Sequence, residues 1–525
     1  MPGRFDFGGV NLNAGESSAG ARPSSETPFS MAILGDFSGR ASRGLADVKT
    51  VGERRPILID RDNFDEVFAG LKVELHLATA EGVPIVLEFS ALDDFHPDHL
   101  FEHPAFQKLR ELRGRLENPS TFARIAEELG VESGPSASSL ARKIDDSEVE
   151  APNPVRRASG SLLDDMIDET EARGAVEGTT GTRDEVREFA RQVAAKYRVA
   201  SPDPRQPEFV AAVDHAVEDV MRKILHCPDF QALEAIWRAT FLLVRQLETG
   251  PGLKLYLFDI SKAELAGDVT SSADLGSSEV FRLLVEKASM TPGADPWALL
   301  VGNYSFGPEH NDTDLLSAMA RIARRAGAPF LAGGSPSLLG VASLAGAASP
   351  RDWTRPEANG WAQLRHLPEA EFIGLALPRF LLRLPYGEDT SPVEAFHFEE
   401  FEDSPAHEDY LWANPAFAVA LLLAESFSQG GWEMRPGSAA QLDRLPFHVY
   451  KSDGEAVSKP CAEMLVTEDA LEYILEGGMI PLVSYKGRDS VRIARFQSIA
   501  QPTRALAGRW SGEANQTSSA ARQIT

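Results

Sequence analysis

Five ionisable residues with metal-binding chemistry stand close together in one short stretch of the sequence. They are Asp93, Asp94, His96, Asp98 and His99. Carboxylates and imidazoles are the oxygen and nitrogen ligands that proteins offer to divalent metals. Aspartate before a helix is first of all an N-terminal cap, however, and Pro97 suits the first helical turn. We therefore interpret the stretch as a helix entry and predict no metal site.

Three other stretches begin like functional motifs but lack a required residue. His407-Glu408 starts like a zinc protease helix, yet no second histidine follows four residues after the first. Residues 333–337 do not match GxSxG, and Pro336 suits a turn more than a nucleophile elbow. The glycine-containing loop 35–40 has neither of the two common phosphate-binding spacings. We predict no catalytic residue and no cofactor.

Two arginines lie inside the most apolar part of the chain, where a buried guanidinium group needs a partner. Arg379 and Arg383 follow the uncharged run 372–377. An acidic stretch that contains Glu399 and Glu400 lies just downstream. We predict that at least one of these arginines is buried and paired with a carboxylate such as Glu399 or Glu400.

The surrounding residues indicate a structural core. Residues 372–377 read as a strand buried on both faces and ended by Pro378. The segment 410–415 leads into the almost wholly apolar helix 416–427. We assign a structural role to the motif residues Arg379, Arg383, Pro385, Tyr386 and Trp412.

The elements that must position these residues alternate between strands and helices, which predicts an α/β fold. The segment 72–77 alternates apolar and polar residues and predicts a half-buried strand with 85–89 as its partner. Ser261 and Glu264 form a capping box at the start of a helix. The other expected strands are 28–34, 253–260, 297–301 and 329–332, and the expected helices include 184–197, 207–225, 230–247 and 312–325.

Length and composition limit the possible classes of protein. With 525 residues there is room for more than one domain. The net charge of -26 argues against nucleic acid or an anionic membrane as partner, since both would repel the chain. Cys227 and Cys461 cannot make a disulfide framework or a zinc cluster. No apolar run reaches about 18 residues, so we expect a cytoplasmic protein without membrane insertion.

Residues 131–160 are rich in Ser, Pro, Gly and mixed charge, so they are the best candidate for a flexible interdomain linker. The short helix expected over 161–170 follows this linker. It carries Leu162, Leu163, Met166 and Ile167 on one face, opposite several carboxylates. Such a helix is marginal in water by itself. It either packs on its own domain or binds in the groove of a partner.

Several motifs in the first part of the chain resemble one known family. The stretches LGDFSGR, RPILIDRDNFDEV and LDDFHPDHL occur in the order typical of the small sheath subunit of type VI secretion systems, the TssB (VipA, ImpB) family. The resemblance covers about residues 28–125. It implies a small-subunit-like domain over 28–130, preceded by a flexible arm over 1–27.

The second half resembles the large sheath subunit, the TssC (VipB, ImpC) family, over about residues 160–502. The most characteristic matching stretches are LPRFLLRLPYG, YLWANPAFA and GGMIPLVSYKGRDS. The chain thus looks like both subunits fused, with a large-subunit-like domain over 161–502 and a polar tail over 503–525. We expect two α/β domains with mixed sheets and flanking helices.

The resemblance implies a structural role in a contractile sheath that assembles around an inner tube and contracts to propel it. Implied partners are other sheath protomers, the inner tube protein, the baseplate and the disassembly ATPase ClpV. In the family ClpV recognises an LLD-type helix, which here matches residues 162–170. An accessory protein that caps or regulates the sheath, and an α/β enzyme on a related fold, are the alternatives.

Two departures from the family pattern qualify this expectation. Large subunits continue beyond the position of Pro502 with a segment that completes the layer between protomers, whereas here a polar tail follows. The arm before Pro28 also lacks the longer alternating strand usual in the small subunit. We therefore expect the isolated chain to stay monomeric or form small oligomers, and to assemble with a full-length large subunit.

Overall fold

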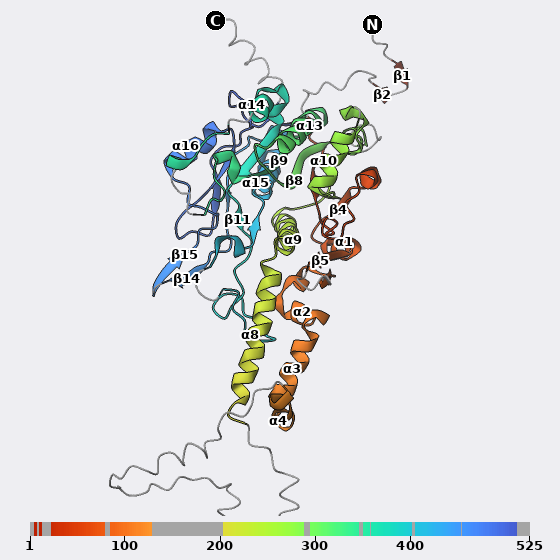
Figure 1. The fold of residues 1–525 in the computed structure, drawn as a ribbon. Coiled ribbons are helices and arrows are strands. Elements are labelled where there is room, and N and C mark those ends of the chain that lie inside the picture. The colour runs from red at the N-terminus through yellow and green to blue at the C-terminus, as the bar shows by residue number, and fades with distance from the viewer. Residues whose placement is uncertain are drawn as a thin grey trace, which may run out of the picture. The chain divides into compact units, whose positions relative to one another are not determined.

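A nine-stranded mixed sheet forms the centre of the unit built from residues 1–105 and 218–525 (Figure 1). Its strands are parallel from β7 to β16, and antiparallel strands complete both edges. In spatial order the strands are β13 (Gln441–Leu442), β17 (Val491–Ile493), β16 (Ile480–Ser484), β10 (Ile373–Leu377), β9 (Phe330–Gly334), β8 (Trp297–Phe306), β3 (Phe29–Gly35), β7 (Leu253–Asp259) and β4 (Ile57–Ile59).

The computed structural model describes most of the chain. The described residues are 5–7, 10–12, 23–78, 85–128, 203–272, 274–287, 295–345, 350–356, 359–401, 405–452 and 454–511. The predicted helices over 161–170 and 184–197, and the predicted linker over 131–160, lie outside them.

Strand β3 joins the two parts of the sequence. It lies between β7 and β8, pairs in parallel with both, and buries all seven of its residues. Burial on both faces explains why FSMAILG is apolar without alternation. The small-subunit-like region therefore contributes strands to the same sheet as the large-subunit-like region, whereas we expected a sheet in each. The sequence pattern alone cannot reveal this shared sheet, because a run of buried residues does not indicate which strands lie beside it.

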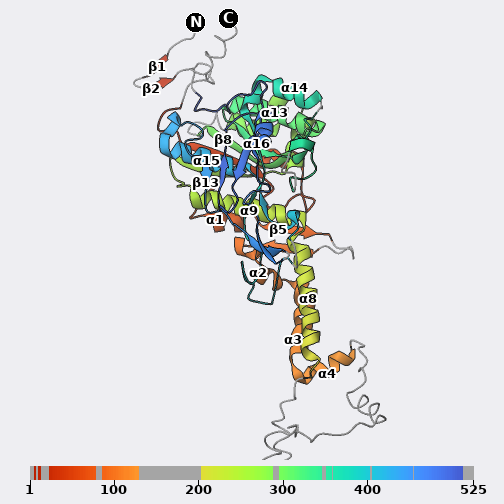
Figure 2. The same ribbon diagram turned by 90° about the vertical axis from the view of Figure 1, so that its left-hand side faces the viewer.

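Helices cover both faces of the sheet, as expected for an α/β fold (Figures 1 and 2). Residues of α10 (Lys262–Ser271) and α13 (His310–Ala326) form one buried cluster with Ala32 and Leu34 of β3. On the other face, α9 (Pro228–Gln246) and α15 (Ala416–Gly430) are adjacent to β3. The rings of Phe29 and Phe427 are 4.9 Å apart there, and Gly35 leaves room for Ile236. The prediction of an α/β fold is confirmed.

Shorter pairs of strands surround the main sheet. β5 (Val73–Leu77) and β6 (Ile85–Phe89) pair antiparallel, as the alternating pattern predicts. β1 (Phe5–Phe7) pairs with β2 (Val10–Leu12) inside the segment expected to be a flexible arm. The remaining pairs are β11 (Phe380–Leu381) with β12 (Trp412–Ala413), and β14 (Val449–Ser452) with β15 (Glu455–Ser458).

The other helices of this unit are short. The α-helices are α1 (Phe64–Gly70), α2 (Pro97–Phe101), α11 (Glu279–Phe281), α14 (Asn359–His366) and α16 (Glu468–Glu476). A π-helical turn, η5 (Arg282–Glu286), continues α11. The 3₁₀ turns include η1 (Val48–Glu53), η2 (Leu92–Phe95), η4 (Leu275–Ser277), η6 (Pro336–Leu339), η7 (Pro350–Asp352), η8 (Pro368–Phe372), η9 (His407–Asp409) and η10 (Gly431–Glu433).

Residues 106–217 form the second unit, which is helical where it is described. It holds α3 (Gln107–Glu117), α4 (Pro119–Glu128) and the first part of α8 (Gln206–Leu225). Leu116, Phe122 and Val213 form its small buried cluster with Ile125 and Ala126. Arg113 Nε lies 2.6 Å from Asp214 Oδ1, which fastens α3 to α8.

Candidate functional site

Arg383 lies at the centre of a buried ion-pair network beside β11. Its side chain is 9% exposed, and its Nη1 lies 2.7 Å from Glu400 Oε2, one of the two glutamates that the sequence suggested. Arg383 Nε also lies 2.9 Å from Glu234 Oε1, which comes from the buried face of α9. The network therefore joins α9 to two separate segments of the loop region after β11.

The rest of the network balances its charge and fixes the turn at Pro385-Tyr386. Arg238 Nε lies 2.6 Å from Glu234 Oε1, so two cations face two buried acids. The guanidinium of Arg383 lies 4.2 Å from the Tyr386 ring centroid, and the Tyr386 N–H donates to Glu400 at 2.8 Å. Burial alone would raise the pKa of Glu400, but Arg383 and the hydrogen bonds lower it to about 2. The arrangement is structural, with Pro385 buried beside it.

Arg379 pairs with two acids that the sequence analysis did not name. Its Nη2 lies 2.6 Å from Glu463 Oε1 and 2.9 Å from Glu408 Oε2. The Arg379 side chain is 40% exposed, whereas that of Glu463 is 3% exposed. The backbone N–H of Arg379 donates to Glu463 as well, at 2.7 Å.

Trp412 and His407 belong to the same cluster as Arg379 and Glu463. The Trp412 indole N–H donates to the carbonyl oxygen of His407 at 2.8 Å. His407 lies 3.2 Å from Glu463 through Nε2, and 3.1 Å from Lys459 Nζ through Nδ1. The sequence spacing argues against a zinc-protease helix at His407, and both imidazole nitrogens lie within hydrogen-bonding distance of the side chains of Glu463 and Lys459.

Two acids near residue 96 accept hydrogen bonds from backbone N–H groups, and the side chain that caps α2 is His96, which accepts from the Asp98 N–H. Asp94 Oδ2 accepts from the backbone N–H groups of Ser90 and Ala91 at the start of η2. Asp98 Oδ1 accepts from the backbone N–H groups of Glu394 and Ala395 at 2.9 and 2.8 Å. These carboxylates are thus used as backbone acceptors.

Within the described ranges, another group could supply three ligand atoms to a metal ion. It consists of Glu388, His397 and Glu399, whose potential ligand atoms lie within 4.8 Å of one another. Glu388 and His397 are exposed, and Glu399 already accepts from the Glu388 N–H at 2.9 Å. Exposed acidic groups gather without an ion often enough that we assign no metal site.

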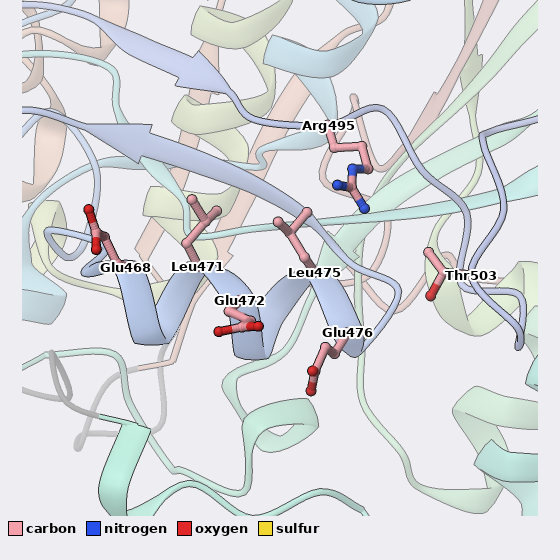
Figure 3. A pocket seen from close by; sticks show the side chains of 7 residues that line it. All are labelled: Glu468, Leu471, Glu472, Leu475, Glu476, Arg495 and Thr503. Carbon is pink, nitrogen blue, oxygen red and sulfur yellow. The ribbon is translucent and has the colours of Figure 1, made fainter.

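An open groove of about 380 Å³ runs along α16 (Figure 3). Thr467 caps this helix by accepting from the Ala470 N–H. Leu471 and Leu475 are half-buried, and Glu468 and Glu472 are exposed without an ion-pair partner among the described residues. The lining residues are Glu468, Leu471, Glu472, Leu475, Glu476, Arg495 and Thr503. The groove offers apolar contact beside a row of carboxylates, a chemistry suited to a basic, partly apolar partner.

Two sequence families match this chain. The VipB family (EvpB/VC_A0108, tail sheath N-terminal domain) matches residues 207–500, which is more than half of the chain. The family described as type VI secretion system, VipA, VC_A0107 or Hcp2 matches residues 9–128. The chain belongs to the type VI secretion sheath family. The VipA match begins before residue 28, so it includes part of the predicted arm.

A curated relative supports the same family. The type VI secretion system sheath protein TssC1 of Pseudomonas aeruginosa is 34% identical over 354 residues, which cover 65% of this chain and 70% of that protein. This chain is therefore a structural component of a type VI contractile sheath, with small-subunit and large-subunit regions fused in one polypeptide. Among the helices that the structure describes, none combines the length and apolarity needed to span a bilayer.

Sequence reasoning missed Glu234 and Glu463, the acids that complete the two ion-pair clusters. Glu234 falls on the apolar stripe of α9, where a charged residue signals a buried partner. That signal was available in the sequence. Glu463 gave no comparable signal, because the segment around it has no regular period.

Proposed function

We propose that this chain is a sheath protomer that assembles with further sheath subunits around an inner tube in the cytoplasm. Baseplate contacts and disassembly by a ClpV-like ATPase belong to the same proposal. The observation that supports it is the position of β3, a strand of the VipA-like region, between β7 and β8 of the VipB-like region in one sheet. One polypeptide thus contains regions that match two sheath families.

The proposed organisation keeps the predicted limits as regions of sequence. Residues 28–130 and 161–502 are the small-subunit-like and large-subunit-like regions, joined by 131–160 and flanked by 1–27 and 503–525. The family matches over 9–128 and 207–500 support a division into two regions, with the first match beginning inside the proposed arm. The shared sheet indicates that the strands β3 and β4 of the first region and the strands of the second region act as one structural body.

The α16 groove is the surface that we propose for the inner tube. Glu468, Glu472 and Glu476 are spaced four residues apart, so they line one side of the helix. Glu476 is already paired with Arg355 at 2.7 Å, so the contact proposed here rests on Glu468 and Glu472. Two half-buried leucines lie beside them. A tube surface with lysine or arginine around an apolar centre would be complementary to this groove, and its binding would weaken with salt.

Assembly can be tested by co-expressing this chain with its cognate inner tube protein and a full-length large sheath subunit. Negative-stain microscopy should then show hollow sheaths around tubes, with this chain identified in them by immunogold labelling. Sheaths that form but never incorporate this chain would contradict the protomer proposal. Labelling confined to the ends of sheaths would favour a capping accessory instead.

The tube contact has its own test. Glu468→Lys together with Glu472→Lys should abolish capture of tube protein by the purified chain. Glu433→Lys together with Glu455→Lys changes the net charge equally at exposed positions outside the groove, so this control should retain capture. If both double variants lose tube capture equally, net charge alone governs the interaction.

A further inference from the structure

Lys459 forms a chain of hydrogen bonds whose geometry resembles that of an activated nucleophile. Its Nζ lies 3.1 Å from His407 Nδ1, and His407 Nε2 lies 3.2 Å from Glu463 Oε1. A nucleophile, a base and a group that orients the base are thus within hydrogen-bonding reach of one another. They come from two segments of the chain, 459–463 and η9.

The donors and acceptors fix the direction of these bonds. An ammonium group can only donate, so His407 Nδ1 must accept and His407 Nε2 must carry the proton that it donates to Glu463. Glu463 accepts this hydrogen bond as an ionised carboxylate. Although burial raises its pKa, the hydrogen bond from His407 and the charge of Arg379 lower that pKa to about 2. His407 is therefore held ready to take a proton from Lys459.

Burial disfavours the charged form of Lys459. The amine is partly buried, and its contacts with two rings, 5.0 Å to the Tyr410 centroid and 5.6 Å to the Trp412 centroid, oppose this effect because an aromatic face attracts a cation. Burial lowers the pKa of Lys459, and this effect exceeds the opposing effects of Glu463 and Glu408. A larger share of neutral amine is available here than at an ordinary exposed lysine.

We propose that Lys459 is a site of covalent acylation, with His407 as the base, and that it accepts acyl groups from acyl phosphates. Arg379 is 40% exposed and paired with both Glu463 and Glu408, so an anionic donor would share this cation with the exposed Glu408. Lys459 does not line the α16 groove that is proposed for the inner tube.

The reaction balances without a redox partner. One ammonium proton passes from Lys459 Nζ to His407 Nδ1, and the neutral amine turns its lone pair to the acyl carbon. An N–C bond forms and the C–O bond to phosphate breaks, so phosphate leaves with the electron pair. The second proton lost by nitrogen goes to the departing phosphate, and His407 returns its proton to water. The products are an amide at Lys459 and inorganic phosphate.

The test uses the full chain and limiting acetyl phosphate, with the acetylation rate of each lysine followed by quantitative peptide mass spectrometry. Lys459 should react faster than the exposed lysines Lys451 and Lys486, which are internal references. His407→Gln should lower the Lys459 rate about tenfold, less than the 10²–10⁴ typical of an evolved general base. The rates at Lys451 and Lys486 should not change in this variant.

Controls separate chemistry from misfolding. His310→Gln changes a histidine that is 84% exposed and should leave every rate unchanged. If His407→Gln does not fold, the pH profile of acetylation in the unaltered chain still tests the proposal. The Lys459 rate should reach its plateau at a lower pH than the Lys451 rate. Lys459 reacting no faster than Lys451, or both rates following the same pH profile, would overturn the proposal.

Discussion

At the scale of single residues, Arg383 is the side chain whose loss should harm the protein most. Its removal leaves Glu400 and Glu234, which are 1% and 0% exposed, with less compensating charge. An orphaned buried charge costs far more than the ion pair itself contributes. We predict that Arg383→Met lowers the free energy of unfolding by on the order of 3–5 kcal/mol, measured by urea denaturation.

Two comparisons make this prediction specific. Arg324→Met removes a more exposed pair, since Arg324 is 48% exposed and its partner Glu369 23%, so it should cost less than about 1 kcal/mol. Adding Glu400→Gln to Arg383→Met should recover part of the loss, because the orphaned charge disappears. A double variant as unstable as the sum of both single variants would show that the two groups do not interact.

The same carboxylates predict how stability depends on pH. The pKa of Glu400 and that of Glu463 are both lowered from 4.5 to about 2 in the folded protein. The unfolded chain therefore binds more protons between these two values, and each group stabilises the fold fully only above about pH 4.5. We expect the unfolding free energy to fall as the pH drops from 4.5 toward 2. Urea titrations across this range should show a shallower slope in Glu463→Gln.

At the scale of elements, the predicted helix 161–170 remains untested because it lies outside the described residues. Its apolar face, with Leu162, Leu163, Met166 and Ile167, suits a groove on the N-terminal domain of a ClpV-like ATPase. We predict that a peptide of residues 155–175 binds that domain in a fluorescence anisotropy titration. Leu163→Asp with Ile167→Asp should abolish binding, because two carboxylates would enter the apolar groove. Unchanged affinity would refute the proposed mode.

Local patterns predicted the elements well because each pattern has a local cause. The buried run at 372–377 became β10, and the capping box at Ser261 and Glu264 formed with reciprocal bonds of 3.2 and 2.9 Å. Pairing over long distances was harder. Arg383 and Glu400 are 17 residues apart and were connected from the sequence, whereas Arg383 and Glu234 are 149 apart.

At the scale of the whole molecule, the shared sheet shows that the two fused regions form the main sheet together. A linker between two independent domains would allow either half to fold alone. Here β3 provides hydrogen bonds to β7 on one side and β8 on the other. Without it, two buried strands would become unpaired edges, which invite aggregation. The segment that holds β3 and β4 is therefore part of the core of the sheet, although the sequence places it in a different family.

This arrangement predicts that cutting the chain within 131–160 will not separate its halves. Phe29, Met31, Ile33 and Leu34 are fully buried, which contributes at most roughly 6–12 kcal/mol at about 1.5–3 kcal/mol for each side chain. About 8 kcal/mol corresponds to micromolar affinity, so the fragments should remain together. A protease site inserted in 131–160 should yield two bands on a denaturing gel that elute as one species in size-exclusion chromatography. With Ile33→Asp, a carboxylate would enter the sheet and the fragments should part. Separation of the fragments without that substitution would mean that β3 does not hold the halves together.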